Sequence, residues 1–101
     1  MTKADVVSEV ASQTGLEKVD VQEVIESFFS VLKDNMSQGN NIYFRGFGSF
    51  VVKRRAQKIG RDIARNRSKV IPPHYVPSFK PSKSFAERVK QNVSDDGSQQ
   101  D

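Results

Sequence analysis

One strongly basic segment near the middle of the chain sets the main limit on how the chain can fold. The sequence from Lys53 to Lys69 carries eight Lys and Arg residues, a single acid, Asp62, and no aromatic residue. Burying such a segment on both faces would cost on the order of several kcal/mol for every unpaired cation. The segment must therefore project into solvent, where it favours a polyanionic partner.

The residues around the basic segment predict a long β-hairpin. Strand-forming residues lie at 49–52 and 70–71, and the turn-prone Asp62 and Asn66 lie between them. We therefore expect a two-stranded basic arm over residues 53–76, a shape that fits a groove of duplex DNA. Single-stranded nucleic acid is a weaker expectation, because its binding sites supply aromatic stacking platforms and this segment has none.

The net charge of +4 is divided unevenly along the chain. Residues 1–44 carry three basic and seven acidic side chains, whereas residues 45–90 carry thirteen basic and two acidic ones. That division favours nucleic acid or an anionic membrane surface as the partner. The N-terminus has no hydrophobic signal region, and no apolar run approaches the roughly 20 residues needed to span a bilayer. We expect a protein of the cytoplasm and nucleoid whose partner is double-stranded DNA and not a membrane.

Two helices are predicted before the arm, and together they form a helical hairpin. The first begins at a capping box formed by Thr2 and Asp5, and Gly15 ends it. The second is expected to run from a cap at Asp20 to Gly39. Its apolar residues recur at helical spacing and form a face broader than the short first helix can cover.

The rest of the chain predicts strands and one short helix. A strand at 42–45 leads into a Gly-Phe-Gly run at 46–48, which is interpreted as a bend between strands. A phosphate-binding loop is disfavoured there because no helix follows and the lysine of that motif is missing. Prolines in the return strand restrict it to a sheet edge. A helix at 83–90 follows with Ser82 as its cap, and residues 93–101 are expected to be a disordered acidic tail.

The predicted fold class is α+β, in one domain of residues 1–92. It comprises an N-terminal helical hairpin at 1–39, a three-stranded antiparallel sheet that extends into the basic β-ribbon arm, and a short C-terminal helix. Without arm and tail, roughly 70 residues remain to build a core, which is marginal for an isolated domain. We therefore expect a dimer, with a homodimer favoured and a heterodimer with a paralogue left open. Its candidate interface residues are Phe28, Phe29, Leu32, Phe44, Phe47, Phe50 and Phe79.

Residues typical of catalysis or metal binding form no motif. There is no cysteine, and His74, the only histidine, has no acidic cluster near it in the sequence. No nucleophile and base share a motif, so no enzyme, metal, cofactor or small-molecule substrate is expected. The acidic tail could compete with DNA for the arm, but its three charges are better explained as a solvated tail.

The sequence resembles the bacterial HU and integration host factor family over about residues 1–92, without gaps. The diagnostic stretch is Arg45-Gly46-Phe47-Gly48-Ser49-Phe50, followed by Lys53, Arg55, Lys58, Gly60 and Arg61 at the family's spacing. Further matching runs are Met1-Thr2-Lys3-Ala4-Asp5, Ile71-Pro72 and Val76-Pro77-Ser78-Phe79-Lys80-Pro81.

The resemblance implies that two chains interlock and that their arms curve around one duplex along its minor groove. HU and integration host factor are themselves standard examples of minor-groove proteins that bend DNA by inserting apolar wedges. The implied function is compaction and bending of DNA with little sequence specificity. The candidate DNA-binding residues are Lys3, Arg45, Lys53, Arg54, Arg55, Lys58, Arg61, Ile63, Arg65, Asn66, Arg67, Lys69, Lys80 and Lys83.

The sequence departs from the family at the tip of the arm. The family has Arg-Asn-Pro with a Gly three residues after the Pro, whereas here Ile63 replaces the Pro and Asn66 replaces the Gly. Asn tolerates the left-handed conformation better than most residues, and Ile is among the apolar residues that act as wedges. We interpret Ile63 as a wedge between base pairs, with simple strand propensity as the alternative.

Two other functions stay open at this point. One is a site-specific DNA bender of the integration host factor type, which a footprint at a single consensus site would identify. The other is a structural protein that coats extracellular DNA, which fractionation would identify.

Overall fold

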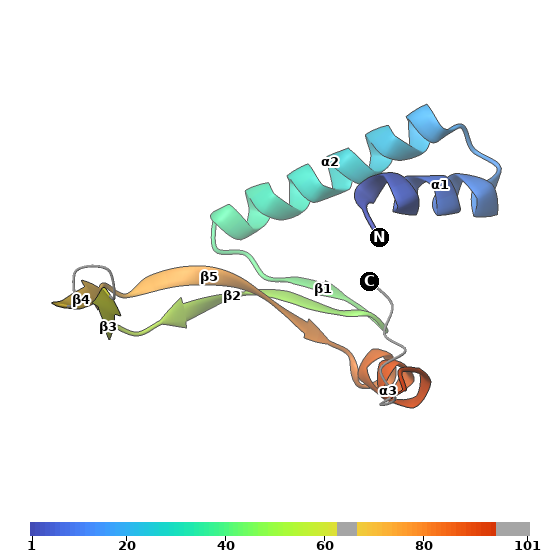
Figure 1. The fold of residues 1–101 in the computed structure, drawn as a ribbon. Helices are drawn as coiled ribbons and strands as arrows, with labels where there is room; N and C mark the ends of the chain where they lie inside the picture. The colour runs from blue at the N-terminus through green and yellow to red at the C-terminus, as the bar shows by residue number, and fades with distance from the viewer. Residues whose placement is uncertain (63–66, 95–101) are drawn as a thin grey trace.

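The computed structural model describes residues 1–62 and 67–94 of the chain, and Figure 1 shows its helical hairpin above a long twisted sheet. The elements in chain order are α1 (Lys3–Thr14), α2 (Lys18–Ser37), β1 (Ile42–Phe44), β2 (Gly48–Arg55), β3 (Lys58–Asp62), β4 (Arg67–Ile71), β5 (His74–Pro81) and α3 (Lys83–Asn92). The predicted α+β order is confirmed. The tip of the arm at 63–66 and residues 95–101 of the predicted tail (93–101) lie outside the described residues, whereas Val93 caps α3 through its N–H to the carbonyl of Val89.

Local capping fixes the first helix as the sequence predicted. The backbone N–H of Asp5 donates to Thr2 Oγ1, and the backbone N–H of Thr2 donates to the Asp5 carboxylate at 2.9 Å. Gly15 adopts a left-handed φ of 76°, and its N–H donates to the carbonyl of Ala11. Both ends therefore satisfy backbone groups that the helix itself leaves unpaired.

The predicted start of α2 at Asp20 is wrong. The helix begins at Lys18 with Glu17 as its N-cap, which makes no side-chain capping bond. Packing against α1 explains the earlier start, because Val21 is only 3% exposed and lies against Val7 and Ala11. The first turn must form before Val21 to hold it there, and Asp20 then lies in that turn, where the helix dipole favours an acid.

Strands β1, β2 and β5 form an antiparallel sheet with β2 in the centre. The proline-containing β5 is an edge strand, as predicted, and it pairs with β2 from Gly48 opposite Pro81 to Arg55 opposite His74. The predicted bend between β1 and β2 is also confirmed. After this bend, Gly48 begins β2 beside Lys80 of β5. A Cβ atom at Gly48 would lie 2.5 Å from the carbonyl oxygen of Lys80, so only glycine allows β2 and β5 to approach this closely.

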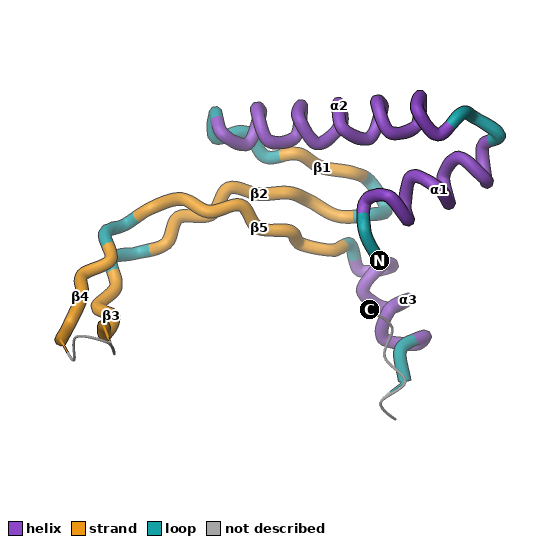
Figure 2. Tube along the Cα trace, turned by 45° about the horizontal axis from the view of Figure 1, so that its top comes forward, coloured by secondary structure: helices purple, strands orange, loops and turns teal. Residues whose placement is uncertain are grey.

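The basic arm has a joint that the sequence analysis did not predict. Strands β3 and β4 form a separate ladder from Lys58 opposite Ile71 to Asp62 opposite Arg67. Between this ladder and the β2–β5 ladder, pairing stops at residues 56–57 and 72–73. Both residues of the second pair are proline, which has no N–H to donate. Figure 2 shows the ribbon turning at this joint, so the arm is a jointed hairpin and not one continuous ladder.

The aromatic side chains form one connected layer that the chain alone covers poorly. Ring centroids lie 4.8–6.3 Å apart along a network that joins all seven phenylalanines, from α2 through the sheet to α3. Yet Phe28 and Phe29 are 44% and 43% exposed. In the described part of the chain, the buried hydrophobic side chains are Val7, Ala11 and Val21. Among the described residues, the aromatic layer is therefore left partly open to solvent.

Candidate nucleic-acid interface

The strand register sorts the basic residues of β2 onto two faces. Lys53 and Arg55 lie on one face, opposite Val76 and His74, whereas Arg54 lies on the other face. The face with Arg54 continues into Phe50 and Val52, which together with α2 line an apolar groove. Lys53 and Arg55 therefore lie on the face of the sheet that points away from α2, and Arg54 lies on the face that points toward α2.

The distal ladder adds further basic positions beyond the joint. Lys58 and Lys69 are exposed and belong to opposite strands. Arg61 and Arg67 lie in β3 and β4, where they pair with Ser68 and Asp62. Three predicted DNA-binding residues lie outside the described residues: Ile63, Arg65 and Asn66.

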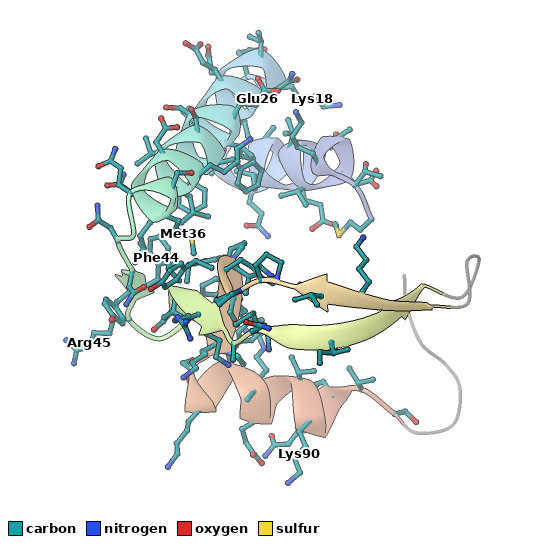
Figure 3. The ribbon with its side chains drawn as sticks, turned by 90° about the vertical axis from the view of Figure 1, so that its left-hand side faces the viewer. Lys18, Glu26, Met36, Phe44, Arg45 and Lys90 are labelled. Atoms are coloured by element: carbon teal, nitrogen blue, oxygen red, sulfur yellow. The ribbon has the colours of Figure 1, made fainter. Side chains whose placement is uncertain are left out.

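Three other predicted cations gather at the end of the sheet far from the arm. Arg45 and Lys80 line a shallow pocket of about 370 Å³, and Lys83 begins α3 beside it. Ser82 fixes this corner. Its hydroxyl donates to the carbonyl of Gly46 at 3.1 Å and accepts the N–H of Phe85, which caps α3 as predicted. Figure 3 shows the Arg45 side chain extending outward, so this corner offers a second cationic surface.

Lys3, also predicted to contact DNA, is already paired within the chain. Its Nζ donates to Glu26 Oε2 at 2.6 Å, and Gln22 donates to the same carboxylate oxygen at 3.2 Å. The Lys3 hydrogen bond is the main cause that holds the pKa of Glu26 below its ordinary value. Both side chains of the ion pair are about half exposed.

An apolar groove of about 550 Å³ separates the C-terminal half of α2 from the sheet. The predicted dimer residues Leu32 and Phe50 line it. The other lining residues were not predicted to lie at the interface; they include Met36, Val52, Tyr75, Val76 and Pro77. The helical spacing that marked Leu32 also marks Met36, whereas the strand residues follow only from the register. In Figure 3 Met36 and Phe44 lie in the space between α2 and the sheet. Phe47 lies elsewhere, stacked on Phe85 of α3.

The described residues show no sign of a metal centre or a membrane span. Across 1–62 and 67–94, no three His, Cys, Asp or Glu side chains come together in a way that could hold a metal ion. Within the same ranges, no helix is long and apolar enough to cross a membrane.

The sequence matches the family model described as bacterial DNA-binding protein over residues 1–90. The chain belongs to this family. Among its relatives, DNA-binding protein HU of Thermus thermophilus is 33% identical over 90 residues, which cover 89% of this chain and 93% of that protein. Integration host factor subunit beta of Paraburkholderia phymatum is also 33% identical, over 94 residues that cover 92% of this chain and 88% of that subunit.

Solved structures of family members share the fold. An Anabaena HU–DNA cocrystal structure matches with a TM-score of 0.84 and 30% identity, and the match covers 88% of this chain and 97% of that chain. An HU variant from Thermotoga maritima matches with a TM-score of 0.66 and 28% identity, covering 88% and 99%. The predicted family is confirmed, but HU and integration host factor relatives are equally similar in sequence.

Proposed function

We propose that this family member is an architectural protein that binds duplex DNA, bends it and compacts it with little sequence preference. The basic arm carries the proposal: exposed Lys and Arg residues follow both strands of a ribbon that extends beyond the body of the protein. The likeness to an HU chain crystallised with DNA supports it. We further propose that the protein acts on the nucleoid, in the cytoplasm.

Affinity would come mainly from phosphate contacts. If about six to ten phosphates are neutralised, the logarithm of the binding constant should fall against the logarithm of salt concentration with a slope of about −5 to −9. We assign the DNA-facing side of the arm to the face that carries Lys53 and Arg55, because the other face continues into the apolar groove.

A second copy of the chain would fill the groove. The described residues include only three buried hydrophobic side chains, too few to stabilise a domain of this size alone, and Phe28 and Phe29 are each almost half exposed. A dimer would cover this apolar layer and present two arms to one duplex. In this proposal the partner is an identical chain, and a heterodimer with a paralogue is the alternative.

Bending would follow from two arms that close in the minor groove. A smooth bend of the DNA costs about 1–6 kcal/mol, and additional contacts with the wrapped duplex offset this cost. In this proposal Ile63 at the tip is the wedge that opens a base step. Unstacking costs a few kcal/mol per step, and therefore already flexible DNA should bind more tightly.

A site-specific bender is the second candidate, because an integration host factor subunit is as similar in sequence as HU is. Binding of the purified protein to linear, nicked and kinked duplexes of random sequence separates the two. The architectural function predicts tighter binding to nicked and kinked duplexes, whatever their sequence. A strong preference for one sequence that survives high salt would favour the site-specific bender, and failure to bind any duplex would contradict both.

A further inference from the structure

His74, the only histidine in the sequence, lies at the joint of the basic arm. It is the first residue of β5, directly after the two prolines at the joint of the arm. Its side chain is exposed, and its partner in the strand register is Arg55 on β2. The imidazole therefore lies on the same face of the ribbon as Lys53 and Arg55.

The hydrogen bond of the ring determines which nitrogen can face DNA. Nδ1 of His74 lies 3.0 Å from the carbonyl oxygen of Pro72. A carbonyl oxygen only accepts hydrogen bonds, so Nδ1 must carry a proton. In the neutral ring Nε2 then carries a lone pair, which repels a phosphate oxygen. The ring can donate to a phosphate through Nε2 only after it takes up a second proton.

The charged groups around the ring are those of a phosphate site. Arg55 faces it from β2, Lys53 lies two residues along the same face, and Lys58 begins β3 on the far side of the joint. The phenol of the neighbouring Tyr75 belongs to the opposite face. Among the residues paired between β2 and β5 there is no carboxylate. A phosphate bound here would meet the fixed cations Arg55 and Lys53 on the same face, with Lys58 beyond the joint, and one side chain that can become a further cation.

We propose that His74 is a phosphate-binding residue that takes up a proton when the arm closes on DNA. The inference rests on the proposed function. Imidazole side chains titrate near neutral pH, so a proton bound with the phosphate couples DNA affinity to pH. Each arm should then bind DNA about fivefold to tenfold more tightly at about pH 6 than at about pH 8, as a charge-assisted hydrogen bond forms.

Two variants separate the effect of the charge on the His74 ring from the effect of its hydrogen bond to the carbonyl of Pro72. His74→Asn keeps a donor near the Nδ1 position, where it can still reach the carbonyl of Pro72, but it cannot become charged. His74→Lys supplies a permanent cation. Binding of all three proteins to the same random-sequence duplex is measured by fluorescence anisotropy at about pH 6 and pH 8, at one ionic strength. Thermal unfolding of each variant checks that the arm is presented by an equally folded protein.

The wild type should bind more tightly at the lower pH, His74→Asn should bind equally weakly at both, and His74→Lys equally tightly at both. The amino terminus is common to all three proteins, so its titration cancels in the comparison. Calorimetry in buffers of different ionisation enthalpy should count up to one proton taken up per arm, and none in His74→Asn. An equal pH response in the wild type and His74→Asn would overturn the inference while leaving DNA binding intact. Loss of binding by all three at both pH values would contradict the proposed function instead.

Discussion

Lys3 Nζ lies 2.6 Å from Glu26 Oε2, so one of the cations expected to contact DNA is already neutralised by its own chain. The pair joins the start of α1 to the middle of α2. A phosphate that approaches Lys3 must compete with this carboxylate. The acidic helical hairpin thus weakens the cationic surface at this point.

Replacing Glu26 by Gln should release Lys3 for phosphate and tighten duplex binding at low salt. We expect about a twofold to fivefold gain, the range that exposed ion pairs reach. The salt dependence should steepen, because an additional phosphate is neutralised. Glu23→Gln on the same helix is the matched control, because it removes the same charge and Glu23 has no ion pair with Lys3. Equal gains in both variants would mean that net charge matters and the Lys3–Glu26 pair does not.

The same pair predicts a pH dependence of stability. The lowered pKa of Glu26 means that folding favours its carboxylate over the protonated form. Its contribution to the free energy of unfolding is therefore fully present above the ordinary pKa of 4.5 and is lost as the pH falls through the lowered value. Urea unfolding of the wild type and Glu26→Gln should differ by a constant amount between about pH 6 and 8 and converge as the pH falls below the lowered pKa of Glu26. If the two free energies of unfolding still differed in acid, the difference would come from an effect of the substitution other than the charge of Glu26.

The two faces of the arm should contribute unequally to DNA binding. Arg55→Gln removes a cation from the face assigned to DNA, whereas Arg54→Gln removes the same charge from the opposite face. We expect the first to weaken binding of all sequences alike and to reduce the salt slope by about 0.9 for each lost phosphate contact. Arg54→Gln should change the binding affinity and the salt slope much less. Salt titrations of the two variants measure the difference, and a larger effect of Arg54→Gln would reverse the assigned face.

The groove between α2 and the sheet should determine the oligomeric state. Met36→Asp places an unpaired charge in the groove, where a partner chain would bury it. At micromolar concentration, sedimentation equilibrium should give roughly twice the 11.4 kDa mass of the chain for the wild type and a smaller, less stable species for the variant. Val19→Asp is the control, because Val19 is 73% exposed and lies outside the groove. A folded wild-type monomer, or equal loss of the dimer in both variants, would contradict a second copy in the groove.

The parts of the fold that depend on local sequence were predicted correctly. Thr2, Gly15 and Ser82 each satisfy backbone groups within a few residues, so their roles can be recognised from spacing alone. The start of α2 was missed because a contact with α1 decides it. The joint was missed because proline interrupts a ladder only where the register requires its N–H, and the register was not known from the sequence.

The same distinction applies to the candidate interface. A run of cations identifies the arm, but the register decides that Arg54 lies apart from Lys53 and Arg55. The pairing of Lys3 with Glu26 joins residues 23 positions apart, and no local pattern marks it. The positions of such side chains depend on packing between elements, which sequence spacing does not encode.

Ring closure of short duplexes of unrelated sequence tests the central claim, that the protein bends DNA without reading its sequence. The wild type should accelerate closure of all of them to a similar degree. Ile63→Ala should bind nicked DNA almost as tightly as the wild type, because its phosphate contacts remain, but it should accelerate closure far less because the wedge is absent. If a saturating concentration of the wild-type protein left the closure rates unchanged, the protein would bind DNA without bending it. The proposed architectural function would then be wrong.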